Sequence, residues 1–126
     1  MRNRGSLSAM TVCLVPSMFM LAALTVDGGR LVVEYQRASD VAASAAREGA
    51  QQIVGIMDGE PHIDVARATA SAEARIRRRG FEGVAVASRT TITVTIVRRV
   101  RLPLLALIGI GDRRVKVERV ADAVLG

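Results

Sequence analysis

The sequence predicts an α+β protein: a long N-terminal helix, a second helix, and then a small antiparallel sheet of about three strands. Three observations carry this prediction. Residues 6–26 contain no charged side chain, small residues recur at helical spacing over residues 31–56, and β-branched residues alternate with polar ones after Gly80. A hydrophobic period near 3.6 is typical of a helix, and a period near 2 is typical of a half-buried strand.

The uncharged run at residues 6–26 is long enough to cross a bilayer as a helix. About 20 apolar residues span a bilayer core, and a helix satisfies its own backbone hydrogen bonds there. Pro16 removes one such bond and predicts a kink rather than a break. A secretory signal has a shorter apolar core of about 7–15 residues. The run therefore favours a retained anchor, although Ala22 and Ala23 resemble a cleavage site.

The charges that flank the uncharged run predict how the helix is oriented in the membrane and where the domains begin. Arg2 and Arg4 make the leader at residues 1–5 purely cationic, whereas the other flank mixes charges of both signs. Cations near a membrane helix favour the cytoplasmic side. We therefore expect a cytoplasmic leader, a transmembrane helix at residues 6–26 and an extracytoplasmic α+β domain at residues 27–126.

The helix is expected to continue beyond the membrane. One stripe keeps helical spacing: Leu31, Tyr35, Ala38, Ala42, Ala45, Gly49, Gln52 and Ile56. Its middle is built from small residues, which let a neighbouring backbone approach closely. Ala38, Ala42, Ala45 and Gly49 are therefore the predicted helix-packing stripe.

A second helix is predicted over about residues 61–79. Pro61 fits the first turn of a helix, and Gly80 is a natural stop signal. Four arginines crowd its C-terminal end: Arg75, Arg77, Arg78 and Arg79. Such a cluster is either a solvated helix end that the helix dipole favours or a contact for an anion or a lipid headgroup.

Three alternating runs follow Gly80 and predict strands. They contain Val84, Val86 and Ser88, then Ile92, Val94 and Ile96, and finally Val115 and Val117. Short connections favour an antiparallel meander. We expect the face of the middle run to pack on the small-residue stripe of the long helix.

Residues 102–110 form a strongly apolar run between arginines. The flanking cations are Arg98, Arg99, Arg101, Arg113 and Arg114. The run is too short to span a bilayer. Three interpretations remain open: a buried connector, a subunit contact, or a loop that lies on the membrane with arginines at the headgroups.

Composition narrows the function classes. The net charge is +6 and suggests anionic partners, but aromatic residues make up only 2% of the chain. Single-stranded nucleic-acid binding normally uses stacking aromatics, so we expect no nucleic-acid partner. Cys13 has no second cysteine to pair with. His62 follows Pro61 without other ligand types at metal-site spacing, which predicts a surface or capping residue, no cofactor and no enzyme.

The N-terminal third resembles a known family. The resembling features are Arg4-Gly5-Ser6, an apolar helix with Pro16, the step Val26-Asp27-Gly28-Gly29-Arg30-Leu31, and an Ala-rich helix through Ala50. Together they resemble the TadE/TadG-like proteins of tight-adherence (Flp) pilus loci, which are pseudopilins or minor pilins. The most telling element is Asp27, Gly28, Gly29 and Arg30. The resemblance extends loosely to the C-terminal half.

The resemblance implies a pilin-like fold in the bacterial cytoplasmic membrane, with pilus or secretion assembly proteins as partners. It also implies homo- or hetero-oligomers through the N-terminal helix, and prepilin-peptidase processing between Gly5 and Ser6. Pilin-type members usually carry Glu at the fifth position after that glycine, where this chain has Met10. A structural or assembly component that stays in the membrane is therefore favoured over a filament-forming pilin.

Two other functions remain open at this stage. The first is a membrane-tethered basic module that binds anionic lipid or an acidic protein. The second is a secreted domain cut near Ala23.

Overall fold

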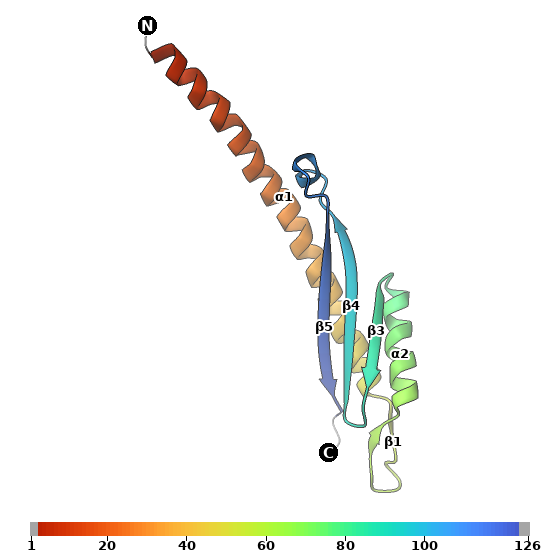
Figure 1. Cartoon of the computed structure of the whole chain (residues 1–126). Coiled ribbons are helices and arrows are strands. Elements are labelled where there is room, and N and C mark those ends of the chain that lie inside the picture. The colour runs from red at the N-terminus through yellow and green to blue at the C-terminus, as the bar shows by residue number, and fades with distance from the viewer. Residues whose placement is uncertain (1–2, 124–126) are drawn as a thin grey trace. The chain divides into compact units, whose positions relative to one another are not determined.

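The computed structural model describes residues 3–123 and confirms the predicted fold class. Its elements are α1 (Asn3–Ala50), β1 (Ile53–Val54), β2 (His62–Ile63), α2 (Val65–Arg78), β3 (Glu82–Ala87), β4 (Thr91–Arg101), the 3₁₀ helix η1 (Leu105–Ile108) and β5 (Asp112–Asp122) (Figure 1). The chain divides into two compact units. The first contains the residues up to Val32 together with Val100–Arg113, and the second contains Val33–Arg99 and the residues from Arg114 on.

The long helix α1 runs without interruption through Pro16 and the glycine pair at 28 and 29. It ends at Ala50, so the prediction that Gln52 and Ile56 continue the helical stripe is wrong. Residues 53–54 instead pair in antiparallel fashion with residues 62–63. Gly55 adopts φ +78°, and a side chain there would overlap the carbonyl oxygen of Glu60. A positive φ favours glycine. Strands of two residues are too short to show a hydrophobic period in the sequence, so this pairing was not predicted.

The second helix starts later than predicted. Asp64, not Pro61, precedes its first turn, and the Asp64 carboxylate accepts a hydrogen bond from the Arg67 amide at 3.2 Å. A side-chain acceptor at this position satisfies one of the free N–H groups of the helix start. Pro61 instead lies just before β2, and His62 is part of that strand rather than a cap. The predicted end is confirmed, because α2 stops at Arg78 and Gly80 has φ +75°.

The larger sheet has the order β3-β4-β5, and β3 pairs with β4 in antiparallel fashion. Its buried face contains Ile92, Val94 and Ile96, as expected. On β3, however, Ala85 is buried and the valines at 84 and 86 are exposed. The reason lies in α2, which packs so closely on β3 that a side chain at Gly83 would come within 3.3 Å of Ile76 Cδ1.

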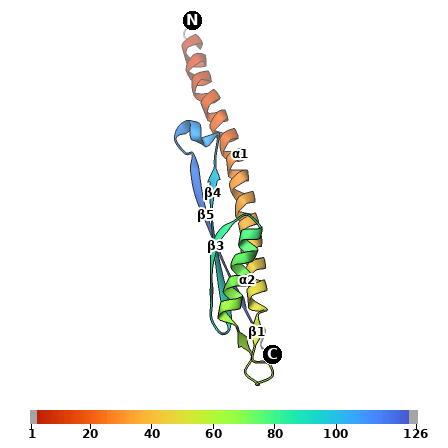
Figure 2. The ribbon, with the colours of Figure 1, turned by 90° about the vertical axis from the view of Figure 1, so that its right-hand side faces the viewer.

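Alanines from both helices meet this sheet within the second unit. Figure 2 shows α2 and the part of α1 after Val33 on the same face of the sheet. The buried helical residues are Ala38, Ala42, Ala45, Ala46, Ala50, Ala68, Ala72 and Ile76. A side chain at Gly49 would overlap Ile92 Cδ1 and lie 3.1 Å from the Ala68 carbonyl oxygen. Small residues thus allow α1, α2 and β4 to share one tightly packed core.

Candidate functional site

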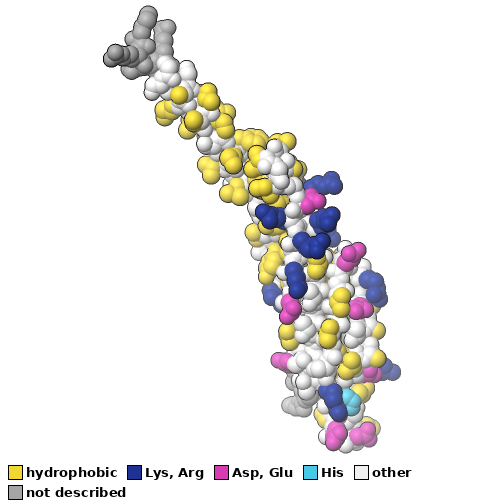
Figure 3. All heavy atoms as spheres, viewed as in Figure 1, with side chains coloured by type: hydrophobic (Ala, Val, Ile, Leu, Met, Phe, Trp, Pro, Cys, Tyr) yellow, Lys and Arg dark blue, Asp and Glu magenta, His cyan; other side chains and the backbone are white. Residues whose placement is uncertain are grey.

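The N-terminal part of α1 exposes apolar side chains. Figure 3 shows hydrophobic atoms along this part of the helix. Val12 is 70% exposed and Leu21 is 66% exposed. By length and composition, α1 can cross a membrane. A core helix of a soluble protein would bury these side chains, so exposure distinguishes this helix from that class.

The segment after β4 folds back on itself within the first unit. The Leu102 amide donates to the Gly111 carbonyl at 2.7 Å, and the Ala106 amide donates to the Leu102 carbonyl at 2.9 Å. Leu102 is buried, whereas Leu107 is 72% exposed. The interpretation of residues 102–110 as a buried connector is therefore wrong for most of the run, because only its first residue is enclosed.

Asp27 joins this loop to α1. Its side chain is fully buried, and its Oδ2 accepts a hydrogen bond from the Leu105 amide at 2.7 Å. Its Oδ1 has no hydrogen-bond partner within residues 3–123. The Leu105 amide lies at the start of η1, where a helix leaves its N–H groups unpaired. Asp27 therefore caps η1 from another element. Sequence patterns did not predict this contact because the two residues are 78 positions apart.

A groove of about 460 Å³ lies between α1 and the loop in this unit. It is lined by Ser17, Met20, Leu21, Leu24, Leu105, Ile108 and Ile110. Ser17 Oγ donates to the Cys13 carbonyl at 2.7 Å, so its hydroxyl is already paired. The groove therefore presents an almost wholly apolar lining.

The other residues of the Asp27 step are open to their surroundings. A side chain added at Gly28 or Gly29 would meet no atom within 4 Å, and Arg30 is exposed. Gly5 and Ser6 lie in the first turns of α1, and Met10 is exposed there. Arg2 and the side chain of Arg4 lie outside the described part of the chain.

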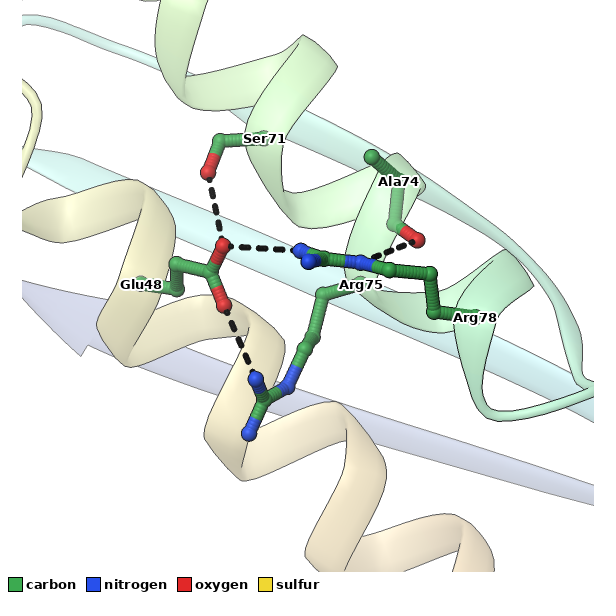
Figure 4. Close-up of polar contacts among 5 residues, drawn as sticks. All are labelled: Glu48, Ser71, Ala74, Arg75 and Arg78. Atoms are coloured by element: carbon green, nitrogen blue, oxygen red, sulfur yellow. Dashed lines mark hydrogen bonds and ion pairs between the residues drawn. The ribbon is translucent and has the colours of Figure 1, made fainter.

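Three of the four clustered arginines join ion pairs in the second unit. Figure 4 shows Glu48 of α1 facing α2: its carboxylate lies 3.5 Å from Arg75 Nη1 and 3.2 Å from Arg78 Nη2, and it accepts a hydrogen bond from Ser71 Oγ at 3.2 Å. Arg77 lies 4.0 Å from Glu73. The cluster thus connects α1 to α2 through Glu48, a role that the helix-end pattern did not reveal.

Arg79 lies at a small polar cavity instead. This cavity of about 100 Å³ is lined by Asp40, Val41, Ser44, Arg75 and Arg79. The Asp40 carboxylate partly offsets the positive charge of Arg75 and Arg79 in this cavity. An anion would meet two guanidinium groups but also the Asp40 carboxylate.

Arg98, predicted as a flank of the apolar run, belongs to a polar group of the second unit. Its guanidinium lies 4.9 Å from the centroid of the Phe81 ring and 3.5 Å from the Glu34 carboxylate. It also donates to the Gly80 carbonyl at 3.3 Å. The Arg98 guanidinium therefore interacts with groups of its own unit. Within the described residues, no group of three or more His, Cys, Asp or Glu side chains could hold a metal ion.

A known protein family has a segment similar to the long helix α1 of this chain. Residues 5–52 match the family model described as "Putative Flp pilus-assembly TadE/G-like". Over these residues the chain is similar to the TadE/G-like family. The match confirms the resemblance seen in the N-terminal third. The TadE/G-like segment contains all of α1 from Gly5 on and leaves α2 and the β3-β4-β5 sheet outside. No curated protein and no solved structure matches the chain.

Proposed function

We propose that the chain is a membrane-anchored structural or assembly component, minor pilin-like or pseudopilin-like, of a tight-adherence type pilus or secretion system. Residues 6–26 would cross the bacterial cytoplasmic membrane, with the N-terminus inside and the α+β domain outside. One observation carries the proposal: the TadE/G-like segment coincides with a single helix that exposes apolar side chains first and buries alanines later.

The two parts of α1 suit two different environments. Side chains from Leu7 to Leu21 are all exposed, and exposed apolar side chains are favourable in lipid but not in water. From Ala38 on, the stripe of small residues is buried in the second unit. Such a helix supports a role in which one part holds the protein in the bilayer and the other part carries a folded domain.

Contacts around Ala23 favour retention of the anchor over signal cleavage. Ala23 is buried, and Asp27 one turn later binds the loop. A cut near Ala23 would remove most of the helix residues that line the apolar groove. The helix is thus part of a folded unit, which a discarded signal sequence would not need to be.

Partners of this helix would be lipid and other helices of the pilus machinery. The exposed apolar side chains before Val26 and the open surface at Gly28 and Gly29 are available to such neighbours. Small residues favour close helix contacts in membranes. We therefore include contacts with assembly proteins, or with further copies of this chain, in the proposal.

The anchor is tested with charged substitutions in full-length protein. A double variant, Leu14→Arg with Met18→Arg, places two charges in the middle of the span, and each costs about 2.5–3.5 kcal/mol there. We expect loss from the alkali-resistant membrane fraction and loss of piliation in the native host. The control is Val84→Arg with Val86→Arg on the exposed face of β3. Membrane integration of the first variant equal to that of the control would contradict the anchor.

One observation favours the basic-module alternative. Arg75 and Arg79 line a small cavity together with Ser44 and Asp40, and guanidinium groups suit phosphate. The variant Arg79→Glu separates the two functions, because the Glu48 ion pairs use Arg75 and Arg78 and stay in place. Unchanged binding to anionic vesicles with lost pilus assembly supports the structural role, and the opposite pattern supports the module.

A further inference from the structure

We propose that residues 102–110 are a second membrane-inserted element, which enters the half of the bilayer nearest Asp27 and contacts phospholipid acyl chains with its exposed side chains. This inference rests on the proposed function, because it requires residues 6–26 to span the membrane. Four features of the first unit support it: depth, backbone pairing, side-chain exposure and charge.

Depth follows from the contacts between the loop and α1. Asp27 is the first charged residue after the uncharged run, and it holds the Leu105 amide. Ile108 and Ile110 share the groove with residues as far back as Ser17. Ser17 lies ten residues before Asp27, or about 15 Å along a helix, and a bilayer core is about 30 Å thick. The loop therefore lies beside the portion of α1 that would be in hydrocarbon.

Most N–H groups of the loop are paired, which lowers the cost of this position. In hydrocarbon, an unpaired N–H or C=O group costs several kcal/mol, so irregular backbone is tolerated only where it is satisfied by protein. The amides of Leu102, Ala106, Leu107, Gly109 and Ile110 all donate to carbonyls of the same loop. Pro103 has no N–H. The Leu105 amide donates to Asp27, so a buried carboxylate supplies the acceptor that the loop lacks.

Side chains of the loop continue the apolar surface of the anchor. Leu107, Ile108 and Ile110 are exposed, as are Leu21 and Leu24 of α1 in the same unit. A soluble protein rarely leaves so many large aliphatic side chains together in water. Since this surface is continuous with the membrane span, its occupant is lipid.

Charge marks the boundary of the inserted part. Arg30, Arg101 and Arg113 are exposed in this unit, and each follows or precedes an apolar segment by a few residues. Arginines at the end of a membrane segment suit the phosphate groups of the interface. The loop thus combines an apolar tip with a cationic base.

Tryptophan scanning tests the proposal cleanly, because the chain contains no tryptophan. Three full-length variants are reconstituted in phosphatidylcholine–phosphatidylglycerol vesicles whose acyl chains are brominated: Leu107→Trp in the loop, Leu14→Trp in the span and Val84→Trp on β3. Bromine quenches tryptophan that touches the acyl chains. We expect blue-shifted emission and at least twofold quenching for the first two variants, and water-like, unquenched emission for the third.

The outcomes separate the loop from the anchor. Quenching of Leu14→Trp without quenching of Leu107→Trp overturns the loop proposal and leaves the anchor intact. Absence of quenching in both overturns the two together. Blue-shifted but unquenched emission from Leu107→Trp means that protein rather than lipid covers the loop, and also overturns the proposal. Ile108→Trp is measured in parallel, so that one badly folded variant does not decide the result.

Discussion

A single carboxylate organises the first unit. Burying a charged group is costly unless hydrogen bonds compensate, and Asp27 is fully buried with a short bond from the Leu105 amide. The bond joins the most recognisable step of the TadE/G-like segment to a loop outside that segment. We infer that this aspartate serves the fold of its own chain as the acceptor for η1.

Replacing Asp27 tests this acceptor role. Asp27→Leu leaves the partly buried Leu105 amide unpaired, which costs about 1–3 kcal/mol, so hydrogen exchange of that amide should rise about tenfold or more. Asp27→Asn keeps an acceptor oxygen and should restore most of the protection. Exchange is measured by NMR in micelles, with Asp40→Leu as the control on an exposed position of the same helix. Equal protection in Asp27→Leu and wild type would contradict the role.

Glu48 has a comparable role in the second unit. Its carboxylate contacts two arginines and one serine of α2. Each single exposed ion pair is worth little, but a group that shares several partners is worth more. Because the side chains are partly exposed, we assign the group about 1 kcal/mol.

Replacing Glu48 with glutamine tests this assignment, because it removes the charge of the side chain and keeps its size. Glu48→Gln should lower the free energy of unfolding by about 1 kcal/mol, and added salt should reduce the difference from wild type because it screens the pairs. Glu82→Gln on an exposed position of β3 should have almost no effect. Chemical denaturation in detergent provides the measurement, and equal effects of the two substitutions would refute the assignment.

At the scale of elements, glycine has opposite consequences at two places on α1. Gly49 lies where the helix touches α2 and β4, whereas Gly29 has open space around it. Alanine stabilises a helix by about 1 kcal/mol relative to glycine. Overpacking a close contact costs about 1–3 kcal/mol. The local environment therefore decides the sign of the same substitution.

This difference gives a paired prediction. Gly49→Ala should lower the unfolding free energy by about 1 kcal/mol, because the clash with Ile92 and the Ala68 backbone outweighs the gain in helix propensity. Gly29→Ala should raise it by up to about 1 kcal/mol. Thermal unfolding followed by circular dichroism measures both. Stabilisation by both substitutions would mean that α1 lies farther from β4 than the structure shows.

The start of α2 allows a second test at this scale. Asp64→Ala removes the acceptor for the Arg67 amide and should cost about 0.5–2 kcal/mol. Asp58→Ala changes an exposed turn residue and serves as the control. Unfolding midpoints of the two variants are compared. An unchanged unfolding midpoint for Asp64→Ala would contradict the cap and would indicate that α2 begins nearer to Pro61.

For the whole molecule, the retained anchor is the central prediction. Intact mass of the protein extracted from membranes should include residues 6–26, either with the first five residues or without them after processing at Gly5. The mass also reports whether Met10 is compatible with processing. A mass that corresponds to a start near residue 24 would contradict the anchor and support a secreted domain.

Fold class and the long apolar helix were predictable because they depend on local pattern. An uncharged run such as residues 6–26 needs a helix in lipid whatever surrounds it, and the strand at residues 91–101 shows its alternation directly. The start of α2 was misplaced because Pro61 fits a first turn as well as Asp64 fits a cap, and only the β1–β2 pairing excludes Pro61. The burial of Ala85 instead of Val84 likewise depends on how closely α2 approaches β3.

The sequence by itself determined that the chain has a membrane-length apolar helix, an Ala-rich continuation and a small sheet, since hydrophobic period and charge are written along the chain. Only the tertiary structure decided which groups Asp27, Glu48 and residues 102–110 contact. Each acts through partners that are distant in sequence, and the energy of a buried carboxylate or an exposed leucine depends on what folding brings next to it. Local pattern contains no record of those neighbours.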